Sequence, residues 1–486
     1  MAVTTVRLGD ADLARLPSAS RPLVRGSQVG IVHIGLGAFH RAHQAVYTEE
    51  ALAAAGGDWG IVGVAPRSRD TLDALVEQNG LFSVATLADD SAEVRVVGSI
   101  VGVLHAAADS DAVLALLASP QVRVVTLTVT EKAYLVDAAG RPVPSEELRA
   151  DLCTDRAPRT IPGLLARALR LRASAGGPPL ALVSCDNLPS NGRRLRAILE
   201  HALGDALPSF VSCPSTMVDR IVPAATSATL DRARAALGLV DLAAVEAEPF
   251  RQWVLEDDFP GGRPAWERVG AVLSSSAGEV AAYERLKLRM LNGSHSTVAY
   301  LGALAGRATI AEAVRLPGMT EFLMAMLCCD VVPTLRPPSS VDAVAYAESV
   351  LERFANPAIG HRTLQVAMDG SQKLPQRLFA SLVERRAAGA EPVGLATGLA
   401  AWIRFVGGVA DDGSALELDD PLAPVLRAAL AVAGPDPRSR VCAILRTPVA
   451  PPGLAEDAVL VELVADRLAA LDRDGAAATL ARMSRP

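Results

Sequence analysis

The stretch that decides the fold reads Gln28-Val-Gly-Ile-Val-His-Ile-Gly35-Leu-Gly37-Ala-Phe39-His40-Arg-Ala-His43. Its β-branched apolar run predicts a strand, Gly35 and Gly37 predict a tight turn, and a helical pattern follows. Strand, Gly-x-Gly and helix open a dinucleotide-binding unit, in which the glycines let the backbone approach a pyrophosphate. His40 stands where the fingerprint has its third glycine, so this pattern also fits a plain strand-to-loop turn.

A second strand-like run favours the dinucleotide interpretation. Trp59-Gly-Ile-Val-Gly-Val-Ala65 arrives at the spacing of a βαβ unit, and Arg67-Ser-Arg69-Asp70 follows it, where the adenosine ribose is bound in such folds. A carboxylate at that place favours NAD, and an arginine accommodates the 2′-phosphate of NADP. We therefore expect NAD as the preferred cofactor through Asp70, with NADP tolerated through Arg69.

Strand-like and helix-like segments alternate through the first half of the chain. Expected strands are 29–34, 59–64, 94–97, 122–130 and 180–185, and expected helices are 43–54, 68–78, 107–117 and 162–173. Such alternation predicts an α/β fold with a Rossmann-like, mainly parallel sheet, which binds ligands at the carboxyl ends of its strands. Long helical patterns follow residue 276. The expected domains are a dinucleotide-binding domain with an N-terminal extension (1–276) and a helical catalytic or substrate domain (277–486).

The helical half contains the stretch Tyr283-Glu284-Arg-Leu-Lys287-Leu-Arg-Met-Leu-Asn292-Gly-Ser-His295. On an α-helix Lys287 and His295 lie about two turns apart, and Asn292 lies about 60° from His295. An amine whose pKa is lowered by burial can take a proton from an alcohol, and an amide can donate to the developing alkoxide. Spacing alone favours a surface helix that happens to carry these residues, so the rest of the chain must decide.

With these segments the chain resembles the polyol-specific long-chain dehydrogenases, the family of mannitol 2-dehydrogenase and fructuronate reductase. The resemblance runs from about Ile31 to the region of Asp420. It rests on Gly35-Leu-Gly-Ala-Phe-His-Arg-Ala-His-Gln44, Leu127-Thr-Val-Thr-Glu-Lys132, Ser184-Cys-Asp-Asn187-Leu-Pro-Ser-Asn191-Gly192, Met217-Val-Asp219-Arg-Ile221, Glu248-Pro-Phe-Arg-Gln-Trp253, Lys287-Leu-Arg-Met-Leu-Asn-Gly-Ser-His295 and Met368-Asp-Gly-Ser-Gln-Lys373.

The resemblance implies a role for each site residue. Lys287 becomes the general acid/base, Asn187 and Asn292 hold the substrate oxygen, and His295 contacts a substrate hydroxyl. Glu284 matches a glutamate near a proton path to solvent, although an i,i+3 salt bridge with Lys287 is the alternative. The implied cofactor-binding residues are Gly35, Gly37, Ala38, Phe39, Arg69, Asp70, Thr128 and Glu131.

The substrate itself stays open between a sugar alcohol and a sugar acid. Asp219 and Lys373 match positions that contact the polyol chain. Gln365 stands where mannitol 2-dehydrogenase has an arginine, whereas Arg251 and Arg362 resemble fructuronate reductase and would pair with a uronate carboxylate or form structural salt bridges. The pairs mannonate/fructuronate and mannitol/fructose are nearly level. Alternatives are a mannitol-1-phosphate 5-dehydrogenase type of activity, or a non-catalytic dinucleotide-binding redox sensor.

Composition excludes several other classes of function. The 486 residues carry a net charge of −7 with no basic block, which argues against nucleic-acid or anionic-membrane partners. No apolar run approaches the roughly 20 residues of a membrane span, and the N-terminus lacks a signal pattern. Six cysteines without a C-x-x-C pair indicate reduced thiols in a cytoplasmic protein. His40 and His43 are too few for a metal site, so we expect no metal, a small sugar substrate, and a monomer or small homo-oligomer.

Overall fold

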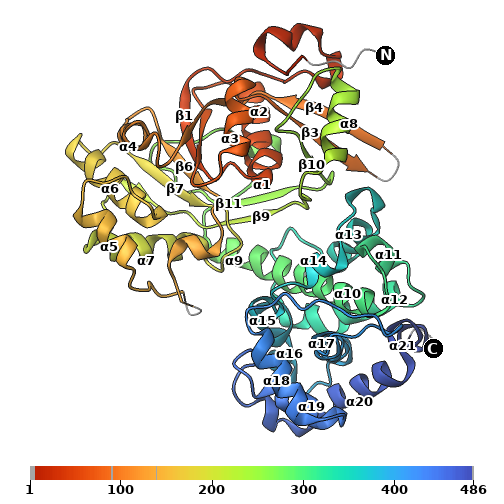
Figure 1. Ribbon diagram of the computed structural model, residues 1–486. Helices are drawn as coiled ribbons and strands as arrows, with labels where there is room; N and C mark the ends of the chain where they lie inside the picture. The colour runs from red at the N-terminus through yellow and green to blue at the C-terminus, as the bar shows by residue number, and fades with distance from the viewer. Residues whose placement is uncertain (1–5, 89–90, 138–139, 484–486) are drawn as a thin grey trace. The chain divides into compact units, whose positions relative to one another are not determined.

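A computed structural model describes residues 6–88, 91–137 and 140–483 and divides the chain into two compact units, Met1–Ala281 and Ala282–Pro486. Figure 1 shows both units coloured along the chain. The division lies inside helix α9 (Ala277–Leu286), and the expected domain boundary after residue 276 lies where that helix begins.

The first unit is built on a six-stranded sheet in which every neighbouring pair of strands is parallel. The strands, in spatial order, are β5 (Ile100–His105), β2 (Gly60–Ala65), β1 (Val29–Ile34), β6 (Val124–Leu127), β7 (Leu180–Ser184) and β8 (Val211–Ser212). Successive residues of β1 enter different cores, Ile31 on one face and Val32 on the other. Burial on both faces explains the continuous apolar runs, and the predicted mainly parallel sheet is confirmed.

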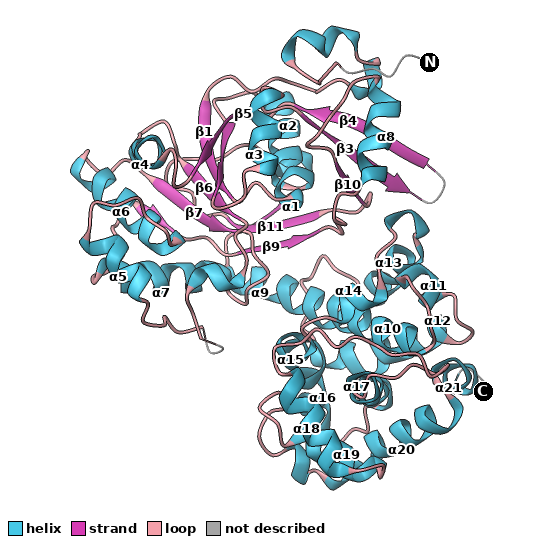
Figure 2. Ribbon diagram, viewed as in Figure 1, coloured by secondary structure: helices cyan, strands magenta, loops and turns pink. Residues whose placement is uncertain are grey.

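Helices cover both faces of this sheet (Figure 2). Side chains of α2 (Gln44–Ala55) and α3 (Asp70–Glu77) enter the first core. Those of α4 (Ser110–Ala118), α6 (Ile161–Ser174) and α7 (Asn191–Leu203) enter the second. The other helices of this unit are η1 (Asp10–Arg15), η2 (Ser18–Ser20), α1 (Ala38–Ala42), η3 (Glu131–Tyr134), α5 (Glu146–Cys153), α8 (Ser227–Leu237) and η4 (Trp266–Val269).

Two small sheets accompany the main one, and one of them contains an expected strand of the parallel sheet. The run 94–97 belongs to β4 (Ser91–Val97), which pairs antiparallel with β3 (Phe82–Ala88) beside β10 (Val245–Ala247). It therefore lies outside the parallel sheet, whose edge is the unpredicted β5. The third sheet contains β9 (Thr216–Asp219), β11 (Gln252–Glu256) and β12 (Val272–Ser274).

The second unit is helical, as predicted, and its core surrounds two buried helices. Every residue of α10 (Gly293–Leu304) is buried, and α17 (Val393–Val406) approaches it so closely that a Cβ at Gly398 would lie 2.8 Å from Thr297 Oγ1. None of the helices in the described residues is both long and apolar enough to cross a membrane. The other segments are η5 (Lys287–Asn292), α11 (Ile310–Val314), α12 (Met319–Ala325), η6 (Met326–Val331), η7 (Val332–Thr334), α13 (Ala343–Ala355), η8 (Pro357–Ile359), α14 (Thr363–Ala367), α15 (Gly370–Leu374), η9 (Pro375–Phe379), α16 (Ala380–Ala387), α18 (Ala423–Ala433), α19 (Pro437–Leu445), η10 (Leu454–Glu456), α20 (Ala458–Asp474) and α21 (Ala476–Met483).

Candidate active site

The turn after β1 is held tightly against the neighbouring strands. Gly35 donates its N–H to Val64 O at 2.9 Å, and its φ of +111° lies in a region that favours glycine. A Cβ at this position would lie 2.8 Å from the carbonyl carbon of Thr128, closer than real side chains approach. Gly37 has an ordinary φ of −66°, and an added Cβ would meet no atom within 4 Å. Gly35 is thus required by the fold, whereas Gly37 leaves open space above the turn.

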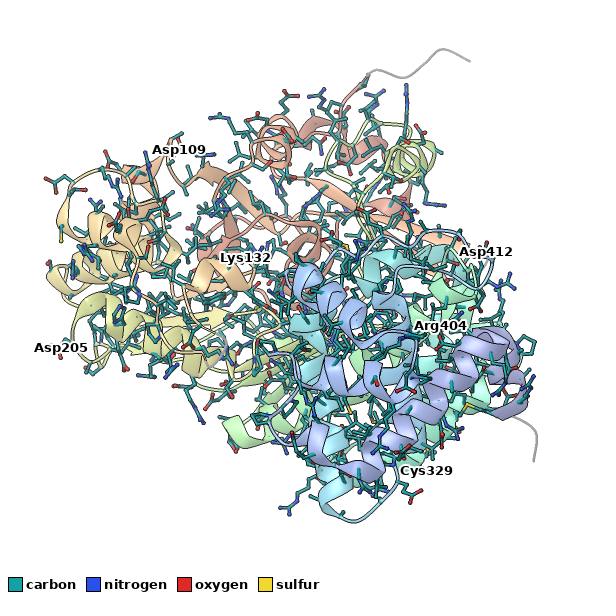
Figure 3. All side chains as sticks on the ribbon, turned by 60° about the horizontal axis from the view of Figure 1, so that its bottom comes forward. Asp109, Lys132, Asp205, Cys329, Arg404 and Asp412 are labelled. Carbon is teal, nitrogen blue, oxygen red and sulfur yellow. The ribbon has the colours of Figure 1, made fainter. Side chains whose placement is uncertain are left out.

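That space is a cavity of about 690 Å³ within the first unit, at the carboxyl ends of β1, β2 and β6. Its volume lies in the range of cofactor sites, and the glycine turn forms part of its wall. Lys132, labelled in Figure 3, and Leu164 also line it. The predicted cofactor residues Gly35, Gly37 and Thr128 line the cavity directly, so the residues present fit a dinucleotide.

The remaining predicted cofactor residues lie beside the lining ones in the chain. Ala38 and Phe39 begin α1, and Glu131 begins η3. Just past β2, the cavity is lined by Pro66, Arg67, Ser68 and Thr71, and the last three flank Arg69 and Asp70. Arg69 is exposed and lies 3.8 Å from Asp73. The sequence argument thus missed Arg67, although it is part of the quoted motif.

Buried histidines lie beside the glycine turn, and one of them bonds its backbone. The carbonyl oxygen of Gly35 accepts hydrogen bonds from His33 Nε2 at 2.7 Å and Thr128 Oγ1 at 2.9 Å. His40 stacks on His33 with ring centroids 3.3 Å apart, and His43 Nε2 donates to Gln252 O at 2.9 Å. Burial lowers the pKa of His33 and of His43 to about 3, so both are neutral at pH 7. These contacts place His40 against the histidine that bonds the turn and join His43 to β11 (Gln252–Glu256).

Asp186 joins the loops that follow β6 and β7. Its carboxylate accepts from the backbone N–H groups of Val129 at 3.1 Å and Thr130 at 3.0 Å, and from the hydroxyl of Tyr134 at 2.6 Å. Thr130 has a φ of +71°, which is rare for a β-branched residue and is held by these bonds. Asn187, exposed directly after this aspartate, is therefore fixed beside the loop that carries Thr128 and Glu131. The sequence argument did not assign Asp186 this clamp.

In the second unit Lys287, Asn292 and His295 lie on one continuous helical stretch with a local change of geometry. Residues Lys287–Asn292 form a π-helix, η5, between α9 and α10. The expected α-helical angles are therefore wrong here. Because π-helical hydrogen bonds join residues five apart, Lys287 and Asn292 lie one turn apart along the same side. Lys287 is buried, with 7% of its surface exposed, and His295 is also buried.

Aromatic and cationic groups surround His295. Its ring stacks on Phe354 at 4.8 Å and meets the edge of His361 at 5.0 Å. Its pKa is lowered well below 6.5 by burial, and then by the charges of His361, Arg377, Arg353 and Lys373. Arg377 donates to Ser296 Oγ at 3.0 Å. The structure thus places Lys373, a predicted substrate residue, in the surroundings of His295.

The remaining predicted site residues belong partly to the first unit and partly to the second. In the first unit Asp219 is buried at the end of β9. Arg251 pairs with Glu50, lies 4.4 Å above the ring of Tyr47, and lines a separate cavity of about 290 Å³. In the second unit Arg362 is exposed in front of α14, and Glu284 is half-buried in α9. The carboxylate-binding role of Arg251 or Arg362 stays a prediction, and for Arg251 the ion pair with Glu50 is the contact in place.

Among the residues that the structure describes, no group of three or more His, Cys, Asp or Glu side chains is arranged to hold a metal ion. The second unit contributes the amine of Lys287, the amide of Asn292 and the imidazole of His295, and the first unit contributes its cavity and Asn187.

Comparison with known proteins identifies the family. Residues 29–268 match the mannitol dehydrogenase Rossmann domain, and residues 279–472 match the mannitol dehydrogenase C-terminal domain. D-mannonate oxidoreductase of Escherichia coli is 43% identical over 405 residues, which cover 81% of this chain and 83% of that protein. Mannitol 2-dehydrogenase of Cereibacter sphaeroides is 38% identical over 81% of this chain and 84% of its own. The Pseudomonas fluorescens mannitol 2-dehydrogenase, solved as a ternary complex with NAD and D-mannitol, is 34% identical with a TM-score of 0.85, covering 99% of this chain and all of that one. The chain belongs to the mannitol dehydrogenase family.

Proposed function

We propose that this oxidoreductase interconverts a linear sugar acid and its keto form, of the mannonate/fructuronate type, with NAD and with Lys287 as general acid/base. The chain acts on CH–OH groups, as its relatives do, and NAD is its cofactor. The observation that carries the mechanism is the π-turn that begins at buried Lys287, ends at Asn292 and leads into His295.

In the oxidation, the substrate hydroxyl gives its proton to Lys287, and Asn292 donates a hydrogen bond to the oxygen as negative charge develops on it. Bound NAD supplies the acceptor for the hydride that leaves the carbinol carbon. His295, neutral because its pKa is lowered by burial, both donates and accepts and so suits a neighbouring hydroxyl. We assign Asn187 as the second amide and Glu284 to the proton path. Reduction of the keto form reverses these steps.

Two observations favour an acid substrate. Identity is higher to D-mannonate oxidoreductase, at 43%, than to the mannitol 2-dehydrogenase of Cereibacter sphaeroides, at 38%. In addition, Lys373 and Arg377 act on His295 by their positive charge, and a carboxylate is the natural counter-ion for such a surrounding. Mannitol/fructose is the second candidate, favoured by the ternary complex that matches nearly the whole chain.

The cofactor and cellular context complete the proposal. NAD is preferred and NADP tolerated, with Asp70 at the ribose and Arg69 beside it, while Gly35, Gly37, Ala38, Phe39, Thr128 and Glu131 hold the rest of the dinucleotide. We propose domains of 1–276 and 277–486, a cytoplasmic location suggested by unpaired cysteines, and a monomer or small homo-oligomer.

The decisive experiment measures turnover of wild type and Lys287→Met with mannonate, fructuronate, mannitol, fructose and mannitol 1-phosphate. General acid–base catalysis is commonly worth about 10²–10⁴-fold, so kcat should fall by that amount while the Kd for NADH is unchanged. Arg285→Met, an exposed cation on the preceding turn, is the matched control and should keep wild-type kcat. Near-normal turnover by Lys287→Met excludes the lysine mechanism, and absence of wild-type turnover on every sugar would leave the redox-sensor alternative.

A further inference from the structure

His361 is held in a fixed place although it lies between helices, after η8 and before α14. Its carbonyl oxygen accepts from the N–H of Ile310 at 2.9 Å. Thr363, two residues on, donates its N–H to Ala308 O at 3.0 Å and its hydroxyl to Arg307 O at 2.7 Å. Gly360, with a φ of +59°, makes the turn that leads into this segment. The backbone of His361 is thus attached to the connection that follows α10, the helix that carries His295.

The side chains of His361 and His295 form a pair. Their ring centroids are 5.0 Å apart with an angle of 65° between the planes, and the ring of Phe354 stacks on His295 at 4.8 Å. Phe354 is buried in the core of the second unit. The ring of His295 contacts Phe354 and the edge of His361, and these two contacts restrict its orientation.

Both imidazoles present a buried nitrogen that the protein does not satisfy. Nε2 of His295 and Nδ1 of His361 have no hydrogen-bond partner within the described part of the chain. A buried polar atom without a partner costs about 1–3 kcal/mol, and such groups in native proteins are usually satisfied. Two of them lie on adjacent rings, so one external partner with two polar groups would satisfy both.

The chemistry of the pair restricts that partner. Burial lowers the pKa of both histidines, and the positive charge of Lys373 lowers that of His361 further, so both rings are neutral at pH 7. A neutral imidazole has one donor and one acceptor. A hydroxyl group satisfies either nitrogen in either tautomer, whereas a carboxylate can only accept and an ammonium can only donate. The pair therefore suits two hydroxyls of one polyhydroxy chain.

We propose that His361 is a second substrate-binding imidazole, which binds a hydroxyl of the same sugar chain that His295 contacts. This inference rests on the proposed function, because it places that substrate at His295. It adds a residue that determines affinity for the polyhydroxy chain and has no part in proton transfer, which belongs to Lys287.

The test combines a variant with substrates that lack single hydroxyls. His361→Phe keeps a ring against His295 and removes both nitrogens, and His361→Asn keeps a donor and an acceptor. With D-mannonate, His361→Phe should raise KM about 5–30-fold, the effect of one lost hydrogen bond of about 1–2 kcal/mol, and His361→Asn should recover part of it. The Kd for NADH and the thermal unfolding midpoint should stay at wild-type values. His201→Phe, which replaces an exposed histidine of α7 in the first unit, is the control and should leave the KM for D-mannonate unchanged.

Analogues of D-mannonate that each lack one hydroxyl distinguish a substrate contact from a structural role. With one analogue, the kcat/KM of the wild type should be as low as the kcat/KM of His361→Phe with D-mannonate. With that same analogue, His361→Phe should have the same kcat/KM as the wild type. An equal added loss with every analogue would overturn the inference. Absence of wild-type turnover would instead contradict the proposed function. The inference is then tested by NMR titration with D-mannonate, and equal Kd values for the wild type and His361→Phe would overturn it.

Discussion

Replacing Gly35 by alanine should destabilise the protein even without cofactor. The φ of +111° costs a residue with a side chain about 1–3 kcal/mol, and the new Cβ would force the turn away from Thr128. That movement puts two hydrogen bonds at risk, Gly35 N–H to Val64 O and Thr128 N–H to Ile34 O, each worth about 0.5–1.5 kcal/mol. We therefore expect a loss of about 2–6 kcal/mol in the free energy of unfolding, measured by denaturant titration of the cofactor-free protein.

Gly37→Ala is the matched control two residues along. Its φ of −66° suits alanine and no atom lies within 4 Å of the added Cβ, so the cofactor-free stability should change by less than about 1 kcal/mol, with a small gain from reduced chain entropy. The same methyl group enters the cavity, so the Kd for NADH, followed by fluorescence, should rise about tenfold or more, equivalent to about 1.4 kcal/mol. If Gly35→Ala and the wild type have the same denaturant midpoint, the close approach of Thr128 to position 35 is not as the structure shows. If Gly37→Ala binds NADH normally, the dinucleotide does not approach this turn.

Three further predictions address the support of the site and the cofactor. Burial lowers the pKa of His33 to about 3 in the folded protein, so between pH 6.5 and pH 3 only the unfolded chain binds a proton at His33. The free energy of unfolding should therefore be constant above pH 6.5 with respect to this group and fall by about 3 kcal/mol at pH 4. Urea titrations of His33→Asn should show a smaller fall. Arg172 donates five hydrogen bonds of 2.7–2.9 Å to backbone carbonyls, so Arg172→Leu should lower the free energy of unfolding by about 3 kcal/mol or more, and Arg172→Lys, with fewer donors, by less. Asp70→Ala should raise the ratio of kcat/KM with NADP to kcat/KM with NAD. Arg67→Ala should lower this ratio more than Arg69→Ala does, because Arg67 lines the cavity. An unchanged ratio in all three variants would place the ribose elsewhere.

The sheet could be predicted wherever local pattern decides the structure. The run 29–34 was expected as a strand and is β1, because a strand buried on both faces is mainly apolar. The partner with which a strand pairs cannot be predicted in this way, because pairing depends on segments distant in the chain. Residues 94–97 and Ile100–His105 are similar apolar runs separated by Gly98-Ser99, yet one joins an antiparallel hairpin and the other the edge of the parallel sheet. Nothing local distinguishes them.

The same limit applies to the candidate site. Motif residues such as Gly35 and Thr128 reach the cavity because strand ends place them there. The clamp of Asp186 on Val129 and Thr130 joins loops more than fifty residues apart in the chain, so it required the structure. His361 directly precedes Arg362, which the sequence analysis singled out, but only its ring contact with His295 gives it a role.

The π-turn at Lys287 gives the predicted site residues a geometry that the α-helical spacing argument did not include. A π-helix is rarely stable by itself, so it needs tertiary contacts to persist. Arg289, in the middle of η5, supplies them: its guanidinium donates to both carboxylate oxygens of Glu384, at 2.6 and 2.8 Å, and to Thr334 O at 3.0 Å. These partners come from α16 and η7, segments that the local sequence of η5 cannot specify. The five-residue interval between Lys287 and Asn292 is therefore best understood together with Arg289, which holds the turn that brings the amine and the amide to one side.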